Sequence, residues 1–134
     1  MVLIVALGLS ACASRPLPSE AAGIILISVS SVAVDVQRPT LRMNDGYLEL
    51  EGYVSRQRDA ETTADTHIDI VFLDVVGRVL AIDMTRFNPR SLPRTRRLPQ
   101  PHGHYRILIP QLPPETRVIE VRAHDGAHET RPGN

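Results

Sequence analysis

The sequence predicts an all-β protein, an antiparallel β-sandwich of about seven strands. Three observations lead to this fold class. Apolar residues make up 43% of the 134 residues, which is enough for a real core. Apolar and polar residues alternate over several short segments, as they do in strands with one buried face. Turn-forming residues separate these segments at short intervals, and no segment has a convincing helical pattern.

The first expected element is a long strand within residues 23–36, broken near Ser30 and Ser31. As a helix, the uncharged residues 21–34 would be about 21 Å long, which is too short for a hydrocarbon core of about 30 Å. Their Ile, Val and Ser content also favours a strand. Val32, Val34 and Val36 are expected to share the inward face of this strand.

Two turns organise the middle of the chain. Asn44-Asp45-Gly46 predicts a tight turn before a strand over residues 47–55. After a polar loop over residues 56–64, a strand over residues 66–74 and the turn Val75-Val76-Gly77 lead to a returning strand over residues 78–87. The residues expected to face inward are Leu48, Leu50, Gly52, Val54, Ile68, Ile70, Phe72, Leu80, Ile82 and Met84.

Residues 88–103 contain four prolines, so we expect a long loop or an irregular edge segment there. Strands over residues 104–109 and 116–124 follow, and a Pro-rich turn joins them. Their expected inward residues are Tyr105, Ile107, Ile109, Ile119, Val121 and Ala123. The sandwich domain therefore spans residues 23–125, and residues 126–134 form a polar, flexible tail.

Three stretches together resemble a known domain class. Gly52-Tyr53-Val54 is followed later by an aromatic strand that ends in a D-x-x-G turn, Asp74 to Gly77, and then by a Pro-containing stretch. This order resembles the small immunoglobulin-like domains of bacterial envelope proteins, including the FxLYD-type domain. The resemblance implies an immunoglobulin-like sandwich and assigns no catalytic residue.

The first residues carry a second resemblance. Residues 2–9 are uncharged and apolar, and Leu9-Ser10-Ala11-Cys12 follows, with the only Cys of the chain. This resembles the lipobox of bacterial lipoproteins. It implies that residues 1–11 are a signal peptide, that Cys12 carries a covalent lipid, and that residues 12–22 are the lipidated tether. No positive charge precedes Val2, so we expect the natural signal to begin upstream. The alternative is a buried apolar N-terminus with an inert Cys.

The lipobox resemblance also implies a location. Ala13 follows the lipidated Cys where the inner-membrane retention signal of enterobacteria has Asp. We therefore expect an outer-membrane lipoprotein that faces the periplasm, with no cofactor other than the lipid on Cys12. The net charge of zero and the absence of Trp give no reason to expect nucleic acid as a partner.

The expected function is that of a non-enzymatic adaptor or accessory subunit of an envelope assembly, with an envelope protein as its partner. No G-x-S-x-G motif and no Gly-rich phosphate loop occur in the chain, so we do not expect an enzyme.

Charge is unevenly distributed along the chain, which suggests an alternative function. Residues 43–83 carry nine acidic residues and three Arg, whereas residues 84–114 carry six Arg and no acid. Arg is suited to bind carboxylate and phosphate, so loop 86–97 is a candidate site for an anionic lipid or glycan. Alternatively, these Arg pair with Glu49, Glu51, Asp69 and Asp83 across the sandwich, or they are simply exposed to solvent. The candidate anion-binding residues are Arg86, Arg90, Arg94, Arg96 and Arg97.

Histidines suggest a further alternative, a periplasmic metal-binding protein. His102 and His104 would lie on one face of a strand, and His124 ends the last strand. If these strands are neighbours, the three imidazoles could converge on a metal ion.

Overall fold

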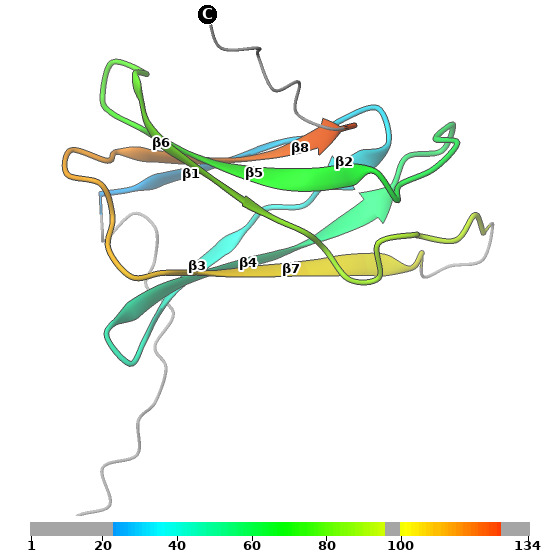
Figure 1. The fold of residues 1–134 in the computed structure, drawn as a ribbon, viewed down its shortest axis with the longest axis horizontal. Coiled ribbons are helices and arrows are strands. Elements are labelled where there is room, and N and C mark those ends of the chain that lie inside the picture. Colours follow the sequence, from blue (N-terminus) through cyan, green and yellow to red (C-terminus); the bar gives the residue numbers. More distant parts are fainter. Residues whose placement is uncertain (1–22, 96–99, 127–134) are drawn as a thin grey trace, which may run out of the picture.

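The structure is a computed structural model that describes residues 23–95 and 100–126. Its eight strands in these ranges form two sheets that face each other in a sandwich-like arrangement (Figure 1). The first sheet contains, in order, β1 (Ile25–Val29), β8 (Val118–Asp125), β5 (Thr66–Leu73) and β6 (Val79–Thr85). The second contains β2 (Val34–Val36), β3 (Thr40–Asn44), β4 (Tyr47–Arg56) and β7 (His102–Ile109). Within the described ranges, no helix is long and apolar enough to cross a membrane.

Strand β4 is the centre of the second sheet, and all its pairings are antiparallel. β2 and β3 pair with different parts of one edge of β4. β7 pairs with the opposite edge of β4, from Leu48 to Ser55. The Asn44-Asp45-Gly46 turn is confirmed, with φ of 46° at Asp45 and 81° at Gly46. The strand that enters this turn, β3, was not predicted.

The first sheet is mixed, which corrects the expectation of a purely antiparallel sandwich. β1 runs parallel to β8, with Ile25 opposite Val118, whereas the β5–β8 and β5–β6 pairs are antiparallel. The predicted break near Ser30 and Ser31 is confirmed, and it is where the chain leaves the first sheet for the second. Val32 lies in this connection and is 85% exposed, so its predicted inward position is wrong.

Strand β6 also differs from its predicted pattern. Ala81 pairs with Phe72 and Val79 pairs with Leu73, so Leu80 is an extra residue at a register shift. A bulge of this kind reverses the inward and outward alternation beyond it. Ile82 and Met84 therefore lie on the outer face and are 57% and 52% exposed, contrary to the prediction that they face inward.

The other predicted inward faces lie between the sheets. Tyr105, Phe72, Leu50, Ile70 and Val121 are among the fully buried side chains, and Leu48 and Ile107 are partly buried against them. The long segment after β6 also contributes to the core, because Phe87 and Leu92 are each only 1% exposed. Asn88 forms a bridge with His104, which joins this segment to the edge of β7.

Candidate functional site

The predicted site residues are distributed over three separate regions. His102 and His104 lie on β7, His124 lies on β8 in the other sheet, and Arg90 and Arg94 lie in the segment between β6 and β7. Cys12, Arg96 and Arg97 lie outside the described residues, so the predicted lipidation site and two of the predicted anion-binding positions have no structural account.

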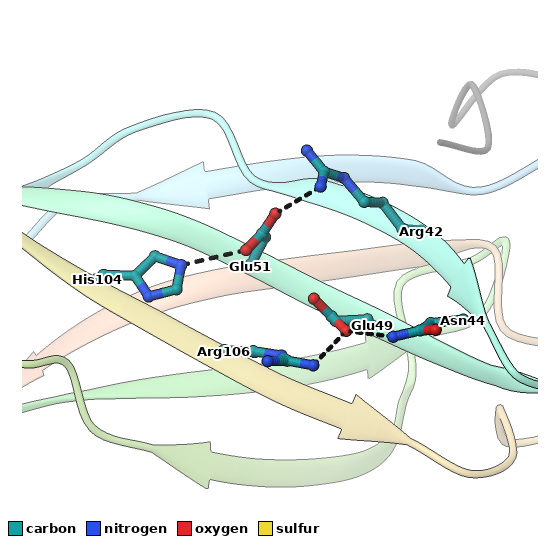
Figure 2. Close-up of polar contacts among 6 residues, drawn as sticks. All are labelled: Arg42, Asn44, Glu49, Glu51, His104 and Arg106. Carbon is teal, nitrogen blue, oxygen red and sulfur yellow. Dashed lines mark hydrogen bonds and ion pairs between the residues drawn. The ribbon is translucent and has the colours of Figure 1, made fainter. Parts of the chain in front are cut away.

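The outer face of the second sheet carries a charge network, shown in Figure 2. Its two acids, Glu49 and Glu51, lie on the central strand β4, and its basic and amide residues lie on the flanking strands. Arg106 Nη2 donates to Glu49 Oε2 over 2.7 Å, and Asn44 Nδ2 donates to the same oxygen over 3.2 Å. Glu51 contacts Arg42 Nη1 and His104 Nε2, each over 3.2 Å.

The alternation of strands explains why this network forms. β4 places Glu49 and Glu51 on the same face, two residues apart, and Leu50 between them is buried in the core. The hydrogen bond from Asn44 lowers the pKa of Glu49, burial raises it, and Arg106 lowers it, so that the pKa lies below its ordinary value. The two carboxylates are therefore matched by cations on both neighbouring strands.

His102 and His104 lie at one end of this face, and both rings are close to the exposed ring of Tyr53. The Tyr53 ring centroid is 6.3 Å from that of His102, in an edge-to-face arrangement, and 5.0 Å from that of His104. Tyr53 is 50% exposed, so this group is accessible from solvent. An aromatic ring beside two imidazoles offers a polar and apolar contact surface for a partner.

The expectation that the strands near residues 104 and 124 are neighbours is wrong. β7 pairs with β4 in the second sheet, whereas β8 pairs with β5 and β1 in the first. His102 and His104 therefore lie on one sheet and His124 on the other, so the predicted convergence of these three imidazoles on one metal ion does not occur. The prediction failed because strand pairing over long sequence separations is not visible in a single sequence.

His124 instead lies beside His67 and Asp69 of β5. His67 is its direct partner in the register, and their ring centroids are 5.0 Å apart. Asp69 Oδ1 is 3.3 Å from His67 Nε2, and Asp69 Oδ2 is 4.0 Å from His124 Nδ1. We call these three residues the histidine–aspartate cluster. It is the group among the described residues whose donor atoms could hold a metal ion.

Sequence reasoning placed His67 and Asp69 on the outer face of their strand but did not treat them as site residues. The available signal was the spacing His67-x-Asp69, which puts an imidazole and a carboxylate on the same face. The unexpected feature is burial, because His67 and Asp69 are 6% and 5% exposed.

The Arg-rich segment contacts the loop between β4 and β5. Arg94 Nη2 donates to the Ala60 carbonyl over 2.9 Å, and Arg90 Nη2 donates to the Ala64 carbonyl over 3.4 Å. Arg56, at the end of β4, donates from Nη1 to the Leu92 carbonyl over 2.7 Å, and from Nη2 to the carbonyls of Ala60 and Glu61. Arginine side chains therefore join the two loops through backbone carbonyls.

An open depression of about 1020 Å³ lies between these two loops. Three arginines, Arg56, Arg58 and Arg94, and one acid, Asp59, are among the residues that line it. Arg86 is exposed, just beyond the end of β6. Arg106, which is not one of the five candidate anion-binding residues, pairs with Glu49 on the neighbouring strand of the same sheet.

Comparison of the chain with protein-family models, with curated proteins and with solved structures finds no match. The resemblance to the FxLYD-type domain therefore stays a prediction, and the candidate sites rest on the geometry described above.

Proposed function

We propose that this protein is a non-enzymatic lipoprotein adaptor, held by a lipid on Cys12 at the periplasmic face of the outer membrane. The lipobox-like Leu9-Ser10-Ala11-Cys12 supports the anchor. Residues 13–22 follow it, and ten residues can extend at most about 35 Å, so the domain would stay close to the membrane. The two-sheet fold is compatible with the immunoglobulin-like class, which we also propose for the domain.

The observation that carries the adaptor function is the exposed edge strand β6. In the described part of the chain, β6 pairs only with β5, so its other edge offers backbone N–H and C=O groups for a further strand. Three apolar side chains on this strand, Val79, Ile82 and Met84, are each more than half exposed. Asp83 is the only charged residue in the strand. An edge of this kind is a template for pairing with another chain.

The partner we propose is an extended segment of an envelope protein that adds to the first sheet as a strand beside β6. Main-chain hydrogen bonds would supply affinity, and alternate side chains of the segment would contact Ile82 and Met84. Val75 and Val76, in the turn before β6, are 82% and 75% exposed and would extend the apolar contact.

Site-specific photo-cross-linking in intact cells tests the docking surface. A photo-cross-linking amino acid replaces Ile82 or, as a control, Leu108, which is equally apolar and 51% exposed but lies on the other sheet. We expect one heteromeric adduct from position 82, absent from position 108, and its loss when Met84→Lys is added. Equal adducts from both positions, no adduct from position 82, or an adduct of two copies of this chain would contradict the adaptor proposal.

The anchor has its own test. Metabolic labelling with a palmitate analogue should label the wild-type protein and leave Cys12→Ser unlabelled, once an upstream signal start is supplied. Label that persists after Cys12→Ser would rule out Cys12 as the lipid site.

A second candidate function is the binding of an anionic envelope ligand, and the depression lined by Arg56, Arg58 and Arg94 favours it. Arg90 and Arg94 contact backbone carbonyls, which do not neutralise their charge. Binding to vesicles that contain phosphatidylglycerol should fall when Arg94, Arg96 and Arg97 are changed together to Gln. It should also weaken as salt rises.

A control variant separates specific binding from net charge. Arg38, Arg78 and Arg117 are exposed arginines outside the segment, and changing them to Gln removes the same charge. If both triple variants lose vesicle binding equally, binding reflects net charge, and the anion-site proposal is wrong.

A further inference from the structure

The outer face of the first sheet carries a cluster that the proposed adaptor function does not use. His67 and Asp69 lie two residues apart on β5, and His124 lies opposite His67 on β8. Pairing within the sheet thus brings together residues that are far apart in the sequence. The three positions are held by two adjacent strands of an ordered sheet, which is the kind of support that a preorganised site needs.

The distances within the cluster are close to those of a metal site. Zn²⁺ binds imidazole nitrogen and carboxylate oxygen at about 2.0–2.2 Å, so neighbouring donor atoms around a tetrahedral ion lie about 3.4 Å apart. Asp69 Oδ1 and His67 Nε2 are 3.3 Å apart, and Asp69 Oδ2 and His124 Nδ1 are 4.0 Å apart. All three donor atoms lie within 4.8 Å of one another. Small side-chain rotations would bring them into the coordination sphere of one ion.

Burial distinguishes this cluster from an exposed group of polar residues. The side chains of His67 and Asp69 are each 8% exposed, whereas that of His124 is 39% exposed. Two donors are therefore shielded from solvent, and the third lies where an ion could enter.

The arginine opposite Asp69 in the register contacts a glutamate. Arg122 is the β8 partner of Asp69, but its guanidinium contacts Glu120, with Nη2 at 2.6 Å and Nε at 2.8 Å from Oε1. The residue opposite Asp69 on β6 is Met84, which carries no charge. A cation at the cluster would thus face one neighbouring arginine whose charge is already paired.

We propose that His67, Asp69 and His124 bind a divalent transition-metal ion, Zn²⁺ being the ion that suits them. Two imidazoles and one carboxylate select against Mg²⁺ and Ca²⁺, which prefer oxygen ligands alone. Three protein ligands leave at least one coordination position open to water or to a donor group from another molecule. This site differs from the set predicted from sequence, with which it shares only His124.

Metal binding by the full chain tests the proposal. The chain carries Cys12→Ser, so that no thiol competes, and it is purified without a histidine tag. We expect one Zn²⁺ per chain in titrations against a chromophoric chelator, and visible absorption on addition of Co²⁺. Loss of a residue that hydrogen-bonds to a metal ligand usually weakens metal affinity about 10–100-fold. Loss of a ligand itself should therefore weaken Zn²⁺ binding at least tenfold. His124→Gln and Asp69→Asn are the test variants.

Two controls keep the experiment decisive. The double variant His102→Gln and His104→Gln removes two imidazoles from the other sheet and should bind Zn²⁺ as the wild type does. His124 is partly exposed, so His124→Gln should fold normally, as judged by the circular dichroism spectrum, even if Asp69→Asn does not. The proposal is overturned if the folded wild type takes up no stoichiometric Zn²⁺, or if folded His124→Gln binds it with unchanged affinity.

Discussion

The ring of Tyr105 lies directly against Gly52, its partner across β4 and β7, so that a Cβ atom at position 52 would approach the Tyr105 hydroxyl oxygen to 2.3 Å. Gly52 is thus required by a close approach and not by an unusual backbone angle. Tyr105 is 1% exposed, and its hydroxyl has no hydrogen-bond partner among the described residues. Burial raises the pKa of Tyr105, which keeps the hydroxyl neutral.

This arrangement predicts opposite effects for two substitutions. Gly52→Ala should lower the free energy of unfolding by about 1–3 kcal/mol, because overpacking displaces the Tyr105 ring. Tyr105→Phe should leave stability unchanged or raise it, because it removes a buried polar group that lacks a partner. In the double variant, Tyr105→Phe should restore part of the stability lost in Gly52→Ala. Urea denaturation measures the free energy of unfolding of all three variants. If the effects of the two single substitutions simply add in the double variant, the two residues do not interact.

The corrected pattern of β6 predicts a contrast between two isoleucines. Ile70 is fully buried on β5, whereas Ile82 is 57% exposed on β6. Ile70→Ala should therefore lower the free energy of unfolding by about 2–5 kcal/mol, and Ile82→Ala should change it by no more than about 0.5 kcal/mol. The two substitutions delete the same atoms, so thermal or urea unfolding compares burial alone. A large decrease in the free energy of unfolding of Ile82→Ala would mean that the Ile82 side chain lies in the core.

Much of the fold was predictable because most strands alternate without interruption. Ile68, Ile70 and Phe72 follow one another on the inner face of β5, and a period of two identifies such a face from sequence alone. The prediction failed at Leu80, where a bulge shifts the register, and at β1, whose parallel pairing with β8 leaves no local signature.

The candidate sites were less predictable because they depend on which strands are neighbours. His124 was identified as a possible ligand, but its partners were sought at His102 and His104 and not at His67 and Asp69. The charge network on the second sheet was not predicted, because the partners considered for Glu49 and Glu51 were the arginines of loop 86–97 and not Arg42 and Arg106 of the neighbouring strands. In both cases the residue types were visible in the sequence, whereas the cross-strand register that joins them was not.

The lowered pKa of Glu49 predicts a dependence of stability on pH. Because its pKa is lower in the folded than in the unfolded protein, the ionised carboxylate stabilises the fold above the ordinary pKa of about 4.5. This stabilisation should be lost as pH falls through the lower, folded-state pKa. Urea denaturation between pH 7 and pH 2.5 should show that wild type and Glu49→Gln differ most at pH 7 and converge in acid. A difference in stability that stays constant over this pH range would contradict a lowered pKa of Glu49 in the folded protein.

The last prediction concerns Arg56, which joins the β4–β5 loop to the segment after β6. Its guanidinium donates to the Leu92 and Glu61 carbonyls, each over 2.7 Å, and its Nε atom is buried without a partner among the described residues. Hydrogen bonds from a charged donor contribute about 1.5–3 kcal/mol each, so Arg56→Ala should lower the free energy of unfolding by about 2 kcal/mol or more.

Arg58 provides the matched control for this prediction. It is an exposed arginine that lines the same depression. Arg58→Ala should change the free energy of unfolding by no more than about 0.5 kcal/mol. Limited proteolysis should also cut Arg56→Ala faster than Arg58→Ala in the segment that contains Leu92, because Arg56 holds the Leu92 carbonyl. Equal stability and equal cleavage in the two variants would mean that the carbonyl contacts of Arg56 do not hold the loops together.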